Sequence, residues 1–209
     1  MKQRCSWLAP LVLLQLACAP TGGDGEGNDT EVISRVQLTF TPQGGGMPIV
    51  AAFDDPDGDG GASGMADAIT LPNGATFELV VELVNGIVDP PEDITVEVEA
   101  ECEEHQLLLL GDAVHGPASS STTALVEHAY ADKESDYAEN LVGDDLPVGV
   151  RNTMTAQQTG NGELRVMLRH MPPVGGAPQK TADVAELAAM DRPLPGEVDA
   201  DVTFALTVQ

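Results

Sequence analysis

Short runs in which apolar and polar residues alternate are the feature of this sequence that most constrains its fold. The first and last runs place these apolar residues on one face: Val36, Leu38 and Phe40, then Val202, Phe204, Leu206 and Val208. Alternation with a period of two is typical of a β-strand with one buried face. Turn-forming segments such as 42–46 separate the runs, and the sequence contains no Gly-rich phosphate loop or βαβ repeat. The pattern therefore predicts an all-β domain.

About eight runs are expected to be strands. They are 35–41, 47–53, 77–83, 106–110, 124–130, 148–156, 163–171 and 201–208. This number of strands with turn signals between them predicts an antiparallel immunoglobulin-like β-sandwich. The acidic segment 132–145 is expected to be an inserted loop, and 181–190, which has helix-forming composition, a turn or two of helix.

Residues 90–110 join two of these runs and carry seven carboxylates between Glu92 and Glu104. Alternating apolar residues in this segment fit a strand, whereas Ile94, Val98, Cys102 and His105 recur at helical spacing. Two prolines followed by acids are typical of a helix start, where free N–H groups favour negative charge. We therefore expect one short acidic helix near 91–105, with His105 at its end.

The N-terminus has the features of an export signal. Residues 1–17 combine two cations with an apolar run too short to span a bilayer. The run ends at Leu16-Ala17-Cys18, which resembles a bacterial lipobox, although Gln15 stands where an apolar residue is usual. Lipidation of Cys18, a flexible acidic tether over 18–30 and a domain over 31–209 are predicted. An ordinary secretory signal cut nearby is the alternative.

Charge and cysteine content narrow the classes of partner. Removal of residues 1–17 would take away two cations and change the formal charge from −25 to −27. Nucleic acid is excluded as a partner because clustered Lys and Arg are absent, whereas cation binding or simple solubility fits the excess of acids. After processing and lipidation only Cys102 remains, so no disulfide within the chain is expected.

The segment from Asp55 to Gly60 has the D-x-D-x-D-G spacing of a calcium loop. Alternate carboxylates converge on one hard cation, and the glycine allows a sharp turn. The predicted calcium ligands are Asp55, Asp57, Asp59 and Asp67. Position twelve of the loop is Ala66 rather than a bidentate Glu. The same residues also suit a plain hairpin tip.

The histidines provide a second candidate site. His170 shares the apolar face of its run with Leu168, and His105 lies on the apolar face of the expected helix, with Cys102 one turn before it. His105, His170 and Cys102 would together suit zinc or copper, and the two histidines are predicted to be spatial neighbours. Both also fit hydrogen-bonded core positions, and a lone cysteine fits a buried apolar one.

Catalytic signatures are absent from the sequence. Serines 119–121 have no G-x-S-x-G context, and one cysteine with scattered histidines forms no dyad pattern. Aromatic residues make up only 3%, which argues against a sugar-stacking platform. The chain is predicted not to be an enzyme.

The motifs together resemble those of a family of small, uncharacterised bacterial envelope lipoproteins. The resemblance rests on a DxDGDGG loop at 55–61, EHQ at 104–106, LRH at 168–170 and the closing strand 202–209. Some members carry the label of a type 1 periplasmic-binding fold, which would need about two α/β domains that this sequence does not contain. Cys102 and the 132–145 insert depart from the family pattern.

The resemblance implies a lipid-anchored protein of the bacterial outer membrane, facing the periplasm or the cell surface. It implies binding of a cation or small ligand in support of an outer-membrane TonB-dependent receptor. A structural or adhesive surface module with a calcium-stabilised loop is the alternative from another class.

Overall fold

The computed structural model describes residues 32–58, 64–139 and 143–209. Its helices and strands are β1 (Arg35–Pro42), β2 (Ile49–Asp54), β3 (Met65–Ala66), β4 (Ile69–Leu71), β5 (Thr76–Asn85), β6 (Glu92–Asp93), α1 (Thr95–Ala100), β7 (His105–Leu110), β8 (Val114–Gly116), β9 (Ser119–Ser120), β10 (Val126–Tyr130), the 3-10 turn η1 (Glu134–Asp136), β11 (Arg151–Ala156), β12 (Gly160–His170), α2 (Val184–Ala189) and β13 (Glu197–Val208). The predicted signal, the lipidated Cys18 and the tether lie outside the described residues, as does Asp59. No helix in the described part of the chain is long and apolar enough to cross a membrane.

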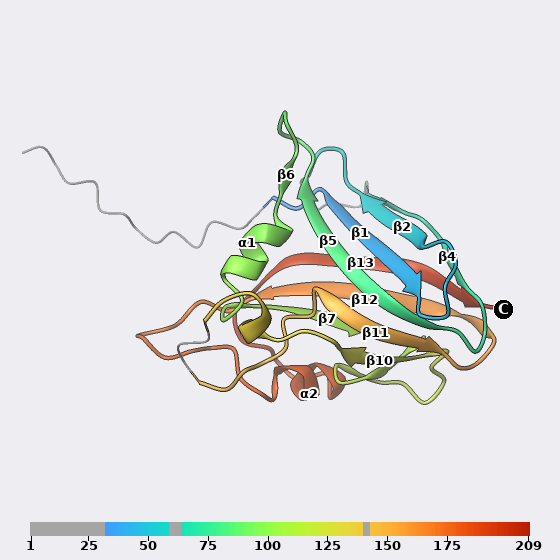
Figure 1. Cartoon of the computed structure of the whole chain (residues 1–209). Helices are drawn as coiled ribbons and strands as arrows, with labels where there is room; N and C mark the ends of the chain where they lie inside the picture. The colour runs from blue at the N-terminus through green and yellow to red at the C-terminus, as the bar shows by residue number, and fades with distance from the viewer. Residues whose placement is uncertain (1–31, 59–63, 140–142) are drawn as a thin grey trace, which may run out of the picture.

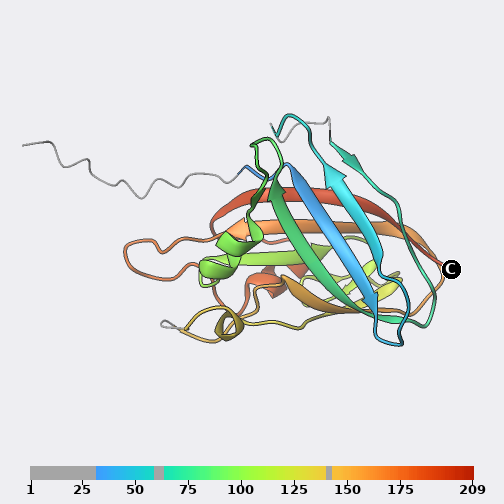
Figure 2. The ribbon, with the colours of Figure 1, turned by 45° about the horizontal axis from the view of Figure 1, so that its top comes forward.

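The strands form two sheets. The larger runs in the order β3-β2-β1-β5-β11-β10-β8-β9, with β6 beside β5, and the smaller in the order β4-β13-β12-β7. Figures 1 and 2 show β1, β2 and β5 crossing over β12 and β13, so that the sheets are the two layers of a sandwich. Eight described strands have five or more residues, and each matches one of the predicted runs. The predicted all-β sandwich is confirmed.

The inward faces of the two sheets make the core, as the alternation predicted. Phe40 and Phe77 of the larger sheet meet edge to face at 6.2 Å, and Phe204 of the smaller sheet is fully buried with them. The apolar strand β7 is buried on both faces: Leu107 packs in this core, and Leu108 packs on the other side with Val184 of α2. A strand covered on both faces has no reason to alternate, which explains its continuous leucines.

The expectation of purely antiparallel sheets is wrong for two pairs. β4 runs parallel to β13, and β8 runs parallel to β10. Alternation reports which face of a sheet a residue occupies, and it carries no information on the direction of the neighbouring strand. Both parallel pairs involve three-residue strands that follow a crossover or a tight turn.

The acidic helix is shorter than the predicted 91–105 span. α1 has six residues, and its side chains Thr95 and Val98 are buried. Its start is fixed to β5, because the Leu83 N–H donates to Thr95 Oγ1 at 2.9 Å and the Ile94 N–H donates to the Leu83 carbonyl at 3.0 Å. β-Branched residues and repeated acids at i, i+4 spacing give the helix little stability of its own. His105 is therefore the first residue of a strand and not the last of a helix.

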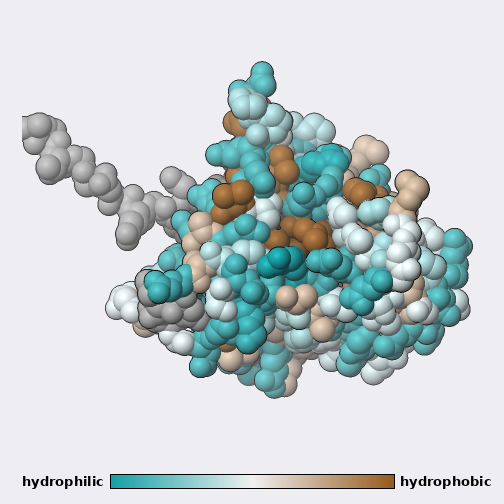
Figure 3. All heavy atoms as spheres, viewed as in Figure 1, coloured by the Kyte–Doolittle hydropathy of each residue, from teal (hydrophilic) through white to brown (hydrophobic). Residues whose placement is uncertain are grey.

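The predicted helical segment 181–190 contains α2, which covers the outer face of the smaller sheet at β7 and β12. Hydrophilic residues cover much of the face seen in Figure 3, and apolar ones gather near β6, α1 and β5. In that region Ile87, Val88 and Val96 are exposed. The segment 132–145, predicted to be an inserted loop, includes η1 and two buried acids, Asp132 and Glu134.

Candidate metal centre

The pairing of β7 with β12 brings His105 and His170 together. The two strands are antiparallel, and their register places the first residue of β7 directly opposite the last residue of β12. The imidazole rings stack with centroids 4.5 Å apart and planes inclined by 11°. The prediction that these histidines are spatial neighbours is confirmed, and their separation lies well within the reach of a shared ion.

The loop before β13 holds the end of β12 in place. The Arg169 guanidinium donates to the carbonyls of Pro195 and Gly196 at 2.5 and 2.6 Å. Gly196 has φ +69°, and a Cβ built on it would lie 1.9 Å from the His170 carbonyl oxygen. Only glycine, which has no Cβ, allows this close approach, so the contact of this loop with the end of β12 that carries His170 depends on Gly196.

Three carboxylates surround the imidazole pair. Glu101 Oε2 lies 4.0 Å from His105 Nδ1, and Glu104 Oε2 lies 3.7 Å from His170 Nε2. Asp199 Oδ2 lies 3.8 Å from His105 Nε2. One ligand atom each from Glu101, His105 and His170 lie within 4.8 Å of one another, which is the spacing of a candidate metal-binding group.

Burial determines the charge state of the inner imidazole. His105 has a fully buried side chain, and this burial, with a smaller contribution from His170, lowers its pKa from the usual 6.5 to about 4. Burial also raises the pKa of the Asp199 carboxyl, while His170 opposes that rise. His105 is therefore neutral near pH 7, so its contact with Asp199 is not an ion pair there. A neutral imidazole is the form that binds a metal.

The site opens to solvent on the side of its acids. The Glu101 side chain is 48% exposed and that of Glu104 is 31% exposed, whereas His170 is 11% exposed and His105 fully buried. The group thus combines a buried nitrogen ligand, a partly accessible one and an exposed carboxylate. This ligand set suits zinc or copper better than calcium, which prefers oxygen ligands throughout.

The structure does not bring Cys102 into this group. The prediction placed it one helical turn before His105, but α1 ends at Ala100 and a turn intervenes. The buried Cys102 thiol instead lies 3.6 Å from the Glu134 carbonyl oxygen, and burial raises its pKa. Glu101 takes the place in the candidate group that the sequence assigned to Cys102.

The predicted calcium ligands fall partly within the described residues. Asp55 is buried just after β2, and Asp57 is exposed two residues later. Asp67 Oδ2 accepts a hydrogen bond from the Ala52 N–H at 3.0 Å, which ties it to the backbone of β2. Because Asp59 lies outside the described residues, calcium binding at this loop stays a prediction.

The other two histidines have partners away from the centre. His128 is buried, and its Nε2 lies 2.9 Å from Asn152 Oδ1. His115 is exposed and lies 3.1 Å from the carboxylate of Glu127. Neither belongs to a candidate metal group within residues 32–58, 64–139 and 143–209. His115 is therefore a suitable control position for metal-binding experiments.

Two important features were missed by sequence reasoning. Asp199 lies before the apolar alternation of the last strand, and its side chain is 1% exposed beside His105. Lys180 and Glu134 form a buried ion pair at 2.8 Å, with side chains 1% and 3% exposed. No local pattern distinguishes these charges from the many solvated acids of the chain.

The fold and site together define an all-β sandwich with a stacked imidazole pair and carboxylates where β7 begins and β12 ends. Comparison of the chain with protein-family models, curated proteins and solved structures finds no match.

Proposed function

We propose that this protein is a non-enzymatic, lipid-anchored protein of the bacterial outer membrane that binds a transition-metal cation, zinc or copper, in support of an outer-membrane receptor. Glu101, His105 and His170 are its ligands. The observation that carries the proposal is the pair of neighbouring imidazoles with a carboxylate at ligand spacing. The predicted export signal and the lipobox-like residues before Cys18 support the anchoring, and the surplus of acids favours a cationic ligand.

The two rings are stacked, with their planes inclined by 11°. The lone pairs of two nearly parallel rings do not point to a common position, so ligation of one ion at about 2 Å requires one ring to turn. His170 is the ring that turns, because it ends its strand and is partly exposed, whereas His105 is enclosed. Glu101 is exposed enough to move onto the ion.

Metal competition against a chromophoric chelator tests the proposal. The purified full-length protein, stripped with EDTA, is titrated with Zn²⁺ and, separately, with Cu²⁺. One ion should bind per chain, and His170→Ala should weaken binding by about a hundredfold, since losing a ligand costs at least as much as losing an outer-shell partner. His115→Ala is the matched control and should bind as the wild type does.

The pH dependence gives a second measurement. Affinity should weaken as pH falls towards about 4, because a proton then competes with the metal for the nitrogen of His105. NMR of the ring protons should show both His105 and His170 shifting on metal addition. Wild-type affinity in His170→Ala, or shifts confined to His115, would refute the assignment.

A further inference from the structure

A β-bulge interrupts the pairing of β12 with β13 beside the metal centre. The register shifts by one residue between Leu168 and Arg169, which leaves Asp199 as an extra residue in β13. A bulge turns a side chain away from the alternation of its strand, and bulges are frequent next to functional sites. Regular alternation would place Asp199 on the outer face of the sheet with Asp201. Its side chain is instead 1% exposed and lies against His105.

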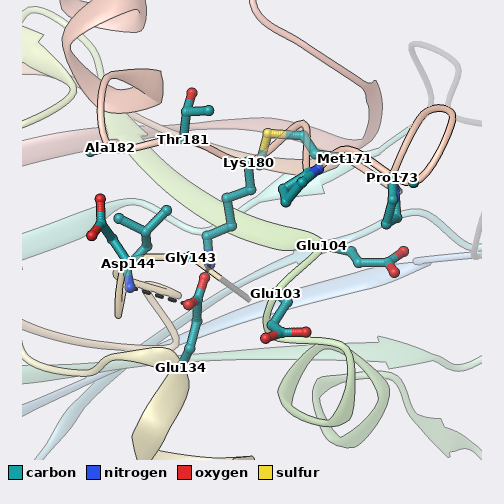
Figure 4. A pocket seen from close by; sticks show the side chains of 13 residues that line it. Glu103, Glu104, Glu134, Gly143, Asp144, Met171, Pro173, Lys180, Thr181 and Ala182 are labelled. Carbon is teal, nitrogen blue, oxygen red and sulfur yellow. Dashed lines mark hydrogen bonds and ion pairs between the residues drawn. The ribbon is translucent and has the colours of Figure 1, made fainter. Parts of the chain in front are cut away.

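The bulge buries the Asp199 carboxylate, and one of its oxygens has no hydrogen bond. Within residues 32–58, 64–139 and 143–209, Asp199 Oδ2 accepts from no donor. The buried Glu134, by contrast, is met by the Lys180 ammonium at 2.8 Å, and Figure 4 shows this lysine extending towards it. A buried acceptor without a donor lowers stability, so an acid kept in such a position calls for a reason other than the stability of the fold.

The two nitrogens of the His105 ring face different groups. Nδ1 lies 3.3 Å from the Glu101 carbonyl oxygen and 4.0 Å from the Glu101 carboxylate. Nε2 lies 3.8 Å from Asp199 Oδ2, on the buried side of the ring. A neutral imidazole carries one proton, and a metal binds the nitrogen that does not carry it. Since Nδ1 is the nitrogen near Glu101, it can share an ion with Glu101 only when the ring proton is on Nε2.

We propose that Asp199 is the positioning residue of the metal centre: its carboxylate accepts the Nε2–H of His105 and so keeps the Nδ1 lone pair directed at the ion. This inference rests on the metal-binding function proposed above. Without Asp199, the Glu101 carbonyl would favour a proton on Nδ1, and that proton would block ligation. A carboxylate behind a metal-binding histidine commonly fixes the tautomer and orientation of the ring in this way.

The proposed hydrogen bond requires only a small movement. Its two heavy atoms must approach from 3.8 Å to about 2.9 Å. Asp199 lines a cavity of about 390 Å³ beside β13, together with Phe53 and Val202, so its side chain has room to turn. The His105 ring can therefore stay enclosed while His170 turns to meet the ion.

Zinc titration of the full-length protein against a chromophoric chelator tests the inference, with Asp199→Asn as the variant. The amide can turn its NH₂ group towards Nε2, which favours the proton on Nδ1, so zinc affinity should fall by about ten- to a hundredfold. The Tm measured in EDTA should not fall, because the substitution removes a buried carboxylate that lacks a hydrogen bond. Asp201→Asn removes the same charge from an exposed position of β13, and zinc affinity should stay within about twofold of the wild type.

Nitrogen NMR of the His105 ring provides a test that needs no variant. In the zinc-loaded wild type the ring proton should be on Nε2, and a proton on Nδ1 would overturn the inference. A lower Tm of Asp199→Asn in EDTA would also overturn it, because Asp199 would then support the fold. A wild type that binds neither zinc nor copper refutes the proposed function and this inference with it. Zinc binding by the wild type that persists undiminished in Asp199→Asn refutes the inference alone.

Discussion

Replacement of Lys180 by methionine should be among the most destabilising single changes in this protein. The Lys180 side chain is 1% exposed, and its partner Glu134 is 3% exposed. Methionine keeps the apolar stem but leaves the Glu134 carboxylate buried without its cation, which costs about 3–5 kcal/mol. The Cys102 carbonyl also loses its 2.7 Å donor. Of a typical total of about 5–15 kcal/mol, this is a fifth or more.

Urea denaturation followed by circular dichroism measures the loss, and thermal melting should show a drop in Tm of about 10 °C. A second substitution, Glu134→Gln, should restore at least half of the stability of Lys180→Met. The neutral amide removes the buried charge and still accepts from the Leu146 N–H, which now donates to Glu134 Oε2 at 3.2 Å. Recovery on adding a second mutation is the signature of coupling within a buried pair.

Lys133→Met is the control. Lys133 lies 3.7 Å from Asp145, and the two side chains are 59% and 37% exposed. An exposed pair of this kind contributes about 0–1 kcal/mol. If Lys180→Met cost no more than Lys133→Met, or if Glu134→Gln worsened rather than relieved the loss, the reasoning about the buried pair would be wrong.

Three further outcomes are expected. The unfolded chain protonates His105 below about pH 6.5, but the folded chain does so only near pH 4. In urea titrations without metal, the free energy of unfolding of the wild type should therefore fall by about 2 kcal/mol more than that of His105→Gln between pH 7 and pH 5. Equal losses would contradict the burial of a neutral ring. Gly196→Ala should lower Tm and weaken zinc affinity together, because the new Cβ would lie 1.9 Å from a carbonyl oxygen of β12; wild-type values for both would show that the approach is not constrained. Calcium should raise the Tm of the wild type in scanning fluorimetry but not that of the Asp57→Ala, Asp59→Ala double variant, and an equal shift in both would remove this loop as the site.

The strands of this fold could be predicted from local pattern because burial on one face of a strand imposes alternation on the residues themselves. Val36, Leu38 and Phe40 are buried as their spacing indicates. Alternation also placed His170 on the inward face of its strand. The direction of neighbouring strands could not be predicted in the same way, because nothing in the three residues of β4 shows that they pair in parallel with β13.

The candidate site was predicted in part. The apolar alternation before His170 correctly indicated an inward ring at the end of its strand, whereas the position of His105 was predicted from a helix that ends before it; the structure stacks the two rings. The assignment of Cys102 depended on a helix that continued to His105, yet α1 ends after six residues. The length of a weak helix is decided by what it packs against, and here contacts with Leu83 hold only its first turn.

The sequence by itself determined that this chain is an acidic β-sandwich, with most of its strands and inward faces, because those properties follow from residues a few positions apart. Only the tertiary structure decided which charges are buried. Asp199 beside His105, and Lys180 against Glu134, resemble in sequence any other charge in the chain. Their burial depends on the register of β7 with β12 and on how the chain after β12 folds over the end of the sandwich. Removing a charge from water costs several kcal/mol, and only a partner brought from elsewhere in the chain by the fold offsets that cost.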